Sequence, residues 1–369
     1  MLADELSRRL EGLRGTEAWR AYEDARRQVL AMKDAERAAA GAAAEPSAYW
    51  REELRELEYL LDASPLVVER LRRHTAHVTG LWAYQYRSQT GAAARGLERR
   101  LRALDERAGG RLGVPEAPEL GGFGHRIDGG LYNLDTLKFH EALVALERAG
   151  VLAGLRARRR PVVWEVGSGW GGFAHQVKTL LPAATYVLVD LPELFLLSAT
   201  YLRALFPAAR VAFVGGAGDP AEPADADFVF VSHHALERPE VPRPDLMANM
   251  VSFQEMTSGQ VRRYVHRAAA MGCPTLYSLN RTRSPYNAEL SSVPEILSER
   301  YELEEVRVLE TDYTRPLPEG RLGRARAGAG RAAAGIGLTA YDPYRHLVGR
   351  LCAAPPSPLG HPPAERAGA

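Results

Sequence analysis

Two carboxylates stand on either side of a glycine-rich turn near the middle of the chain. The turn reads Glu-Val-Gly-Ser-Gly-Trp-Gly-Gly from Glu165 to Gly172, and Asp190 ends the next apolar run. Glycine lets the backbone adopt positive φ and lets a ligand approach the main chain closely. Carboxylates in that setting accept hydrogen bonds from ligand hydroxyls or pair with a ligand cation. The spacing therefore predicts a binding site for a polar, nucleotide-like molecule.

The elements that must position these residues form a βαβ unit. Residues 162–166 are a short apolar run with β-branched members, which predicts a buried strand ended by the glycines. Helical spacing follows over 173–181 and stops before Pro182. A second apolar strand, 186–190, then places its final carboxylate where a ribose hydroxyl pair would bind.

The glycine turn alone fits two cofactors. Gly167, Gly169 and Gly172 satisfy the dinucleotide pattern G-x-G-x-x-G. Glu165 separates the two, because a diphosphate gains nothing from a nearby carboxylate, whereas the cationic amino-acid end of S-adenosylmethionine (SAM) does. We therefore expect SAM as cofactor. The residues expected to bind it around the turn and after the strands are Glu165, Gly167, Ser168, Gly169, Gly171, Asp190, Leu191 and Asn249.

The same motifs resemble those of a known enzyme class. The pattern acidic-x-Gly-x-Gly-x-Gly is similar to motif I of class I SAM-dependent methyltransferases. From about Gly129 to Thr314 the chain resembles, more particularly, the sugar O-methyltransferases of bacterial biosynthetic clusters. That resemblance rests on Glu165–Gly172, Val189–Glu193, Asp245–Asn249, Ser252–Met256 and Asn280–Arg281. It implies a Rossmann-like α/β fold with a mostly parallel seven-stranded sheet flanked by helices, an α-helical N-terminal region, and SAM as methyl donor.

Methyl transfer to a hydroxyl requires an aligned acceptor and usually a base that removes its proton. In this fold the catalytic loop follows a strand at the carboxyl edge of the sheet. If 245–250 is that strand, Glu255 is the base or the carboxylate that orients the acceptor. Ser252 and Phe253 in the same loop, and Arg281 after a later strand, are then expected to bind the acceptor.

Two histidines compete with Glu255 for the role of base. If 227–231 is the catalytic-loop strand, His233 and His234 take its place, and histidine titrates near neutral pH. We prefer 245–250, because that strand leads through its loop into a helix and then a further strand. The histidines would then lie near the adenine, and one of them could still act as base.

The chain just upstream of the βαβ unit holds two further candidates. Residues 109–130 are glycine-rich and lack periodicity, which predicts a hinge or a covering loop. Segments at this position commonly fold over the cofactor in the class that the chain resembles, so Tyr132 and Asn133 are expected to contact SAM. The alternative is that Asn133 or Asp135 caps the following helix.

The composition excludes several classes of protein. The 369 residues are 46% hydrophobic and 25% charged, with a net charge of +1, which gives no electrostatic reason to expect nucleic acid or membrane as partner. Two cysteines are too few for a disulfide framework or a cysteine zinc site; no residues are assigned to a metal, and the use of a divalent ion is left open. Without a signal peptide or a long apolar run, the chain is expected to be cytoplasmic.

Four segments are expected along the chain. Residues 1–110 have helical composition, 111–135 form a linker or covering loop, and 136–314 form the methyltransferase domain. Residues 315–369 are a low-complexity tail in which only 341–351 is predicted to form a short helix. The expected partner is a small-molecule acceptor, and a homodimer is left open.

Three other functions compete with O-methylation of a sugar or hydroxylated metabolite. A carboxylate such as Glu255 would suit a cationic amine or guanidine acceptor at least as well as an alcohol, which keeps N-methylation open. An NAD-dependent oxidoreductase could use the same βαβ unit. A non-catalytic nucleotide-binding or scaffold protein would need the site only for binding.

Overall fold

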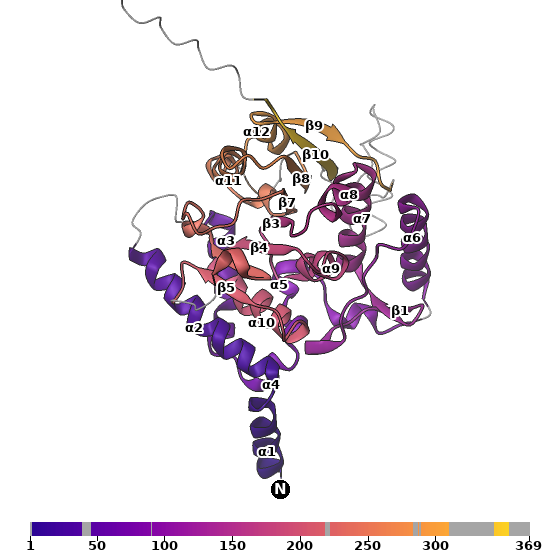
Figure 1. The fold of residues 1–369 in the computed structure, drawn as a ribbon. Helices are drawn as coiled ribbons and strands as arrows, with labels where there is room; N and C mark the ends of the chain where they lie inside the picture. Colours follow the sequence, from indigo (N-terminus) through magenta and orange to yellow (C-terminus); the bar gives the residue numbers. More distant parts are fainter. Residues whose placement is uncertain are drawn as a thin grey trace, which may run out of the picture.

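A twisted sheet with helices on both faces forms the body of the protein (Figure 1). The computed structural model describes residues 2–38, 46–89, 91–217, 222–282, 287, 289–309 and 343–353. Within these residues the main sheet contains eight strands: β3 (Val162–Val166), β4 (Thr185–Asp190), β5 (Val211–Val214), β6 (Phe228–Ser232), β7 (Leu246–Met250), β8 (Thr275–Asn280), β9 (Tyr301–Glu305) and β10 (Arg345–Leu351). Their order is β5-β6-β4-β3-β7-β8-β10-β9. The strands from β5 to β8 are parallel, which confirms the Rossmann-like α/β architecture with one strand more than expected.

The inner strands are buried and mostly apolar because helices cover both faces of the sheet. Alternate side chains point to opposite sides, so Tyr186 and Leu188 enter one hydrophobic core while Val187 and Val189 enter the other. The helices on the first side are α7 (Leu134–Arg148), α8 (Val151–Arg156), α9 (Gly172–Leu180) and α10 (Phe195–Leu205); those on the second side are α11 (Ser258–Ala270) and α12 (Val293–Ser298).

The helical character predicted for the first 110 residues is confirmed. These elements are α1 (Leu2–Arg14), α2 (Glu17–Ala38), α3 (Ala48–Leu57), η2 (Glu58–Asp62), α4 (Pro65–Val68), η3 (Leu71–His74), α5 (Ala76–Thr79), η4 (Ala83–Tyr86) and α6 (Ala92–Ala108). Most of them share the first hydrophobic core: α2 packs along α10 and α6 along α7 (Figure 1). They are therefore part of the same body as the sheet.

The segment between α6 and α7 is more regular than the sequence suggested. It contains the 3-10 turn η5 (Glu119–Gly121) and a hairpin of β1 (His125–Ile127) and β2 (Gly130–Tyr132). Asp128 and Gly129 form its two-residue loop with φ of 48° and 82°. An Asp-Gly pair with two positive φ angles matches the twist of a tight hairpin.

The prediction of a short helix at 341–351 is wrong. Residues 345–351 form β10, which pairs antiparallel with β8 on one side and β9 on the other. His346 and Val348 face the first hydrophobic core, and Leu347 faces the second. This alternation suits a strand that lies between two other strands of the sheet. Long-range pairing thus overrode the local pattern, and the sheet extends beyond residue 314. The tail at 315–342 and 354–369 lies outside the described residues.

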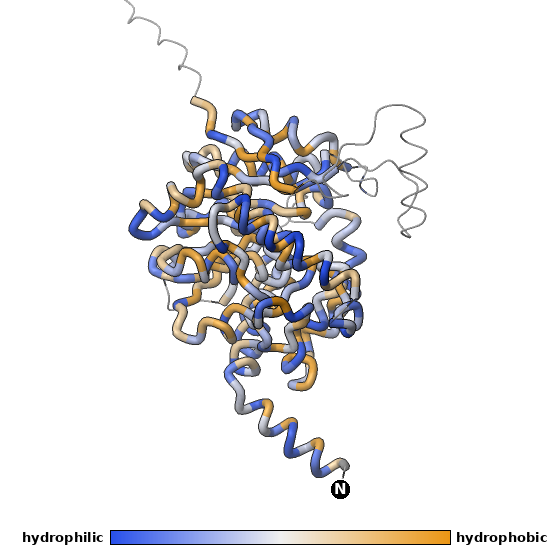
Figure 2. Tube along the Cα trace, turned by 90° about the vertical axis from the view of Figure 1, so that its right-hand side faces the viewer, coloured by the Kyte–Doolittle hydropathy of each residue, from blue (hydrophilic) through white to orange (hydrophobic). Residues whose placement is uncertain are grey.

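The first helix extends away from the body of the protein (Figures 1 and 2). Figure 2 shows hydrophilic and hydrophobic residues alternating along it, and Leu6 on this helix is 46% exposed. Among the helices of the described residues, none combines the length and the apolar character that a membrane crossing requires.

Candidate functional site

A cleft lies at the carboxyl ends of β3, β4 and β7. It encloses about 1040 Å³ of empty space, part of it open to solvent. After β3 the chain adds β4 and its neighbours on one side of β3 and later adds β7 and β8 on the other side, so the strand order reverses at β3. Parallel α/β sheets bind ligands at the carboxyl edge of such a point. Loops after the strands form one side, the sheet wall: Glu165, Gly167, Ser168, Gly169, Trp170, Asp190, Leu191, Met250, Val251, Ser252 and Glu255. N-terminal residues form the other, the helix wall: Pro46, Ser47, Trp50, Val78 and Thr79.

The glycines at the end of β3 are required by backbone geometry. Gly167, Gly169 and Gly171 have φ of 74°, 54° and 84°, where side chains other than glycine are strained. A Cβ on Gly167 would lie 2.0 Å from the Oγ of Ser252, so this turn also packs directly against the loop after β7. The first two glycines and Ser168, all predicted to bind the cofactor, line the cleft. Gly171 instead begins α9 and packs against α10.

Asp190 ends β4 and holds the glycine turn in place. Its Oδ2 accepts hydrogen bonds from Gly169 N at 2.7 Å and Ser168 Oγ at 3.2 Å, and its Oδ1 accepts one from Leu191 N at 2.8 Å. Burial raises the pKa of Asp190 to about 6, against the effect of these hydrogen bonds. A carboxylate has room for about four hydrogen bonds, so acceptor capacity remains for ligand hydroxyls at the cleft.

Glu165 lies inside β3 with its carboxylate at the floor of the cleft. The hydroxyl of Tyr186 donates to its Oε2 at 2.9 Å. The side chain is almost fully buried, and this burial raises the pKa of Glu165 to about 8. A ligand cation at this position would favour the ionised form. Glu165, the acid predicted beside the glycine turn, therefore lines the cleft, and its ionisation depends on the charge of a bound ligand.

Lys138 is a cleft residue that our sequence reasoning missed. It projects from α7, its ammonium lies 3.2 Å from Asp135 Oδ1, and it lowers the pKa of both Glu165 and Glu255. Among the lining residues in the described part of the chain, it is the only lysine or arginine. One signal could have found it: this arginine-rich chain has only three lysines, Lys33, Lys138 and Lys178.

Glu255 lies across the cleft from Glu165, in the short turn η9 (Phe253–Glu255). The preferred alignment is supported, because β7 is the neighbour of β3 and its loop enters the cleft. The Trp50 side chain makes a hydrogen bond to the carboxyl group, and burial raises the pKa of Glu255 to about 8. Ser47 Oγ donates to the backbone oxygen of Glu255 at 2.8 Å. Glu255 thus lies where the helix wall meets the sheet wall.

The loop after β7 is held by a buried polar network below the cleft. Asn249 Nδ2 donates to Val166 O at 2.7 Å and to Ser252 Oγ at 2.6 Å, while its Oδ1 accepts from Asn280 Nδ2 at 2.8 Å. The next loop residue, Val251, lines the cleft with φ of 68°, an outlier for a β-branched residue. Such strain persists where surrounding structure holds it and occurs most often at functional sites.

Four of the predicted contact residues do not line the cleft. Asn249 supports the loop from below, and Phe253 is fully buried in the second hydrophobic core. The guanidinium of Arg281 lies 4.6 Å from the centre of the Tyr344 ring, outside the cleft lining. Gly171, as described above, packs on α10. Ser252 is the one residue of the predicted acceptor set in the lining.

Tyr132 and Asn133 are not part of the cleft either. Asn133 caps α7: its Oδ1 accepts from Thr136 N at 3.0 Å, and its Nδ2 donates to Glu116 Oε2 at 2.7 Å. The hydroxyl of Tyr132 accepts a hydrogen bond from Arg111 at 3.1 Å. The capping alternative is therefore the one observed. The cover over the cleft comes from residues 46–50 and 78–79, much further upstream, because helix packing on α10 brings them there.

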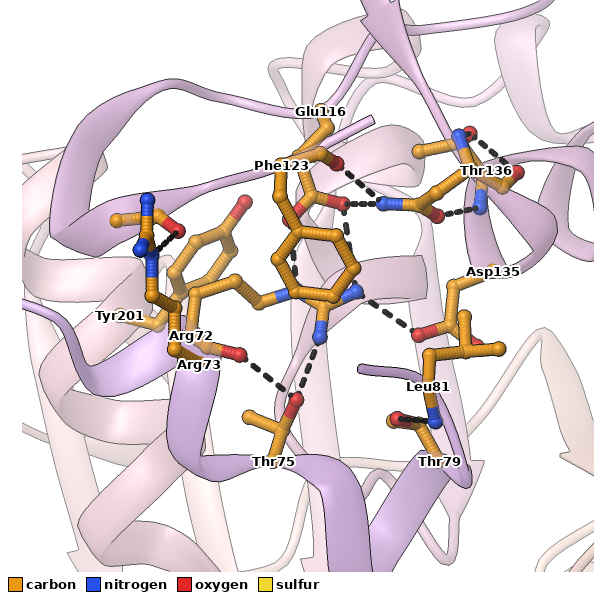
Figure 3. Close-up of polar contacts among 12 residues, drawn as sticks. Arg72, Arg73, Thr75, Thr79, Leu81, Glu116, Phe123, Asp135, Thr136 and Tyr201 are labelled. Carbon is orange, nitrogen blue, oxygen red and sulfur yellow. Dashed lines mark hydrogen bonds and ion pairs between the residues drawn. The ribbon is translucent and has the colours of Figure 1, made fainter. Parts of the chain in front are cut away.

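A buried arginine, Arg72, lies in a network of polar contacts with Thr75, Glu116 and Asp135 (Figure 3). Arg72 pairs with Glu116 Oε1 at 2.7 Å and with Asp135 Oδ2 at 2.9 Å. Its guanidinium carbon lies 3.8 Å from the ring centre of Trp170, which lines the cleft. Since Arg72 is only 1% exposed, both carboxylates compensate for the loss of its hydration. No sequence pattern marked this arginine among so many others.

His233 and His234 follow β6, in the turn η8 (His233–Ala235). His233 lines the cleft and its Nε2 lies 3.2 Å from Glu36 Oε1 in α2. His234 is not among the lining residues, and its Nδ1 lies 2.6 Å from Ser232 Oγ. Burial lowers the pKa of His234 to about 4, and burial raises the pKa of Glu36 to about 7. The two histidines therefore differ in access to a cleft ligand.

No protein-family model matches the chain, and no curated protein matches its sequence. Similar solved structures include a Galdieria sulphuraria protein described as a sarcosine dimethylglycine methyltransferase (TM-score 0.38, 12% identity, covering 68% of this chain and 98% of that one). Another is Haemonchus contortus phosphoethanolamine N-methyltransferase 2 with SAM (0.33, 13%, 72% and 58%). A third is Geobacter metallireducens precorrin-6y C5,15-methyltransferase (0.32, 14%, 55% and 86%). With TM-scores this low, these similarities carry no argument about what the cleft of this chain binds.

Proposed function

We propose that this protein is a SAM-dependent methyltransferase that methylates a hydroxyl group of a small molecule, a sugar or a hydroxylated natural-product intermediate. The observation that carries the proposal is the turn between β3 and β4. There the carboxylates of Glu165 and Asp190 meet two positive-φ glycines, Gly167 and Gly169, at the edge of one cleft. SAM, when bound, supplies a methyl group on a positively charged sulfur.

The residues of the sheet wall fit such a donor. Gly167 and Gly169 line the cleft with main chain that carries no side chain, and Asp190 can accept hydrogen bonds from ribose hydroxyls. Glu165 offers a carboxylate to the ammonium group of the donor, and Lys138 can pair with its carboxylate. A dinucleotide would bring its diphosphate towards Glu165, Asp190 and Glu255, which disfavours an oxidoreductase.

Glu255 is the residue that we propose to orient the acceptor and accept its proton. It faces the cleft beside Trp50, and apolar Met256 lies next to it in the lining. With its pKa near 8, the carboxylate is a stronger base than an exposed glutamate and is ionised in a substantial fraction of molecules near that pH. An indole beside a carboxylate suits a sugar, because a sugar ring has both apolar faces and hydroxyls.

A second candidate keeps the donor and changes the acceptor to a cationic amine or guanidine. It is favoured by the charge of the cleft, where Glu165, Asp190 and Glu255 face one cation, Lys138, among the described lining residues. A guanidinium would pair with Glu255 by charge-assisted hydrogen bonds.

The experiment incubates the full-length protein with methyl-labelled SAM and a panel of glycosides, other alcohols, amines and guanidines. Transfer to hydroxyl acceptors supports the proposal, and transfer only to nitrogen overturns it in favour of the second candidate. Calorimetry with SAM, S-adenosylhomocysteine and NAD tests the donor: binding of NAD alone would remove both methyltransferase proposals. Glu255→Gln should lose transfer but keep SAM, with exposed Glu302→Gln as the matched control.

A further inference from the structure

Three metal-ligating side chains meet beside the cleft, from parts of the chain almost 200 residues apart. Glu36 lies in the last turn of α2, and His233 and His234 lie in η8 directly after β6. One carboxylate oxygen and one nitrogen from each ring all lie within 4.8 Å of one another. Glu36 Oε1 and His233 Nε2 are already 3.2 Å apart. We call these three residues the Glu-His-His cluster.

The spacing is close to what a shared ion requires. Zinc binds imidazole nitrogen and carboxylate oxygen at about 2.0–2.2 Å, so the ligand atoms of a tetrahedral ion lie roughly 3.3 Å from each other. The Glu36–His233 distance satisfies this without movement. The ligand atom of His234 lies within 4.8 Å of the other two.

The surroundings of His234 favour coordination by one particular nitrogen. Its Nδ1 lies 2.6 Å from Ser232 Oγ, which can fix the ring as the partner of a metal-bound histidine usually does. Its Nε2 is buried and has no hydrogen-bond partner among the described residues. A buried ring nitrogen without a partner is unusual, because polar atoms withdrawn from water are normally satisfied. An ion at the Glu-His-His cluster would satisfy it.

We propose that Glu36, His233 and His234 bind one divalent transition-metal ion, with zinc as the most suitable. Two imidazoles and one carboxylate are a ligand set of zinc sites that keep a further position for water or substrate. Because His233 lines the cleft, the ion would lie at its border and would tie α2, a helix of the N-terminal region, to the end of β6. The proposal does not depend on methyl transfer.

The competing explanation is a simple ion pair between Glu36 and His233 that needs no metal. A titration separates the two. Untagged full-length protein, treated with chelator and dialysed, is titrated with zinc chloride against a chromophoric chelator, and its melting temperature is measured with and without zinc. We expect one equivalent bound at micromolar affinity or better and a melting temperature that rises with zinc, since an ion that binds only the folded state stabilises it.

Two variants and one matched control locate the site. Glu36→Gln and His234→Asn should each weaken zinc binding at least tenfold and abolish the thermal shift. His266→Asn should change neither, because His266 is paired with Glu299 at 2.8 Å in an exposed His–Glu pair outside the cluster. Circular dichroism and SAM binding show whether each variant is folded. Absence of zinc uptake by the wild type, or uptake unchanged in both cluster variants, would overturn the proposal.

Discussion

The two walls of the cleft are built in different ways. The sheet wall comes largely from a single stretch of chain, where the carboxylate of Asp190 alone accepts three hydrogen bonds from its own loop and the glycine turn. The helix wall comes from residues 46–79 and reaches the sheet wall through Ser47, Trp50 and the buried Arg72. Further along, ion pairs of Lys33 with Glu193 and Asp24 with Arg203 tie α2 to the region of α10. The Glu165–Leu191 part of the sheet wall is therefore a local structure, and the helix wall is a tertiary one.

This difference suggests a division of labour. In the proposed reaction we assign donor recognition to the local, densely hydrogen-bonded part of the sheet wall and acceptor recognition to the junction where helices meet the loop after β7. Each variant changes one wall of the cleft, and a property assigned to the other wall is measured as the reference. The largest effect is expected at the junction of the two walls.

Glu255→Gln should have the largest effect, because it removes a proposed proton acceptor at the junction while keeping the shape of the side chain. We expect kcat to fall about 10²- to 10⁴-fold, the usual contribution of a general base. The dissociation constant of SAM should change less than threefold. Steady-state kinetics and calorimetry check both values, and loss of SAM affinity in parallel with kcat would contradict the division between the walls.

Gly167→Ala should damage the sheet wall. A Cβ there meets Ser252 Oγ at 2.0 Å on a backbone with φ of 74°. Overpacking costs about 1–3 kcal/mol and left-handed strain about 1–2 kcal/mol, so SAM affinity should fall roughly 30-fold or more. Gly154→Ala in α8 is the matched control, because nothing lies within 4 Å of its Cβ position. Equal SAM binding by the two variants would show that the turn does not hold the donor.

Arg72→Met tests the connection between the walls. It leaves the buried Glu116 without its cation, while Asp135 keeps Lys138 as a partner, and breaking a buried pair costs about 3–5 kcal/mol of unfolding free energy. Exposed Arg70→Met, two residues away, should cost less than about 0.5 kcal/mol. Urea denaturation measures both. A small effect of Arg72→Met would mean that the helix wall is held by its apolar contacts alone.

Trp50→Leu should act on the acceptor side only. The indole contacts Glu255 and lines the cleft, and an aromatic contact contributes about 0.5–1.5 kcal/mol beyond its area. We expect the acceptor KM to rise roughly 2- to 10-fold with little change in SAM affinity. Trp82→Leu is the control, since Trp82 is 46% exposed and outside the lining.

The pH dependence should be the mildest effect and should involve both walls. Folding raises the pKa of Glu165 and Glu255 from about 4.5 to about 8, so the folded state holds these protons more tightly than the unfolded state. Their contribution to stability is complete below pH 4.5 and is lost as the pH rises towards 8. Cationic SAM should bind a few-fold more tightly at pH 8.5 than at pH 6.5. Glu165→Gln should flatten that dependence in calorimetry.

The predictions from sequence had different outcomes because some depend on neighbouring residues in the chain and others depend on contacts between distant residues. The strand–turn–helix–strand order around Gly167 was predictable, since apolar runs, glycines and a proline act over a few residues. Asn133 proved to be a helix cap, because its fit to a helix start is local while its access to the cleft depends on the whole fold. Residues 345–351 became a strand because β8 and β9 leave room for one.

The sequence by itself determined the Rossmann-like core, the glycine turn and the carboxylates Glu165 and Asp190, since neighbours in the chain create those features. Only the tertiary structure decided which residues face them: Trp50 and Ser47 from the N-terminal helices, Lys138 from α7, and Glu36 beside His233. Such pairs join positions up to about two hundred residues apart, and helix packing on the sheet brings them together. Periodicity and spacing reveal which face of an element is buried, but they do not reveal which distant element will cover it.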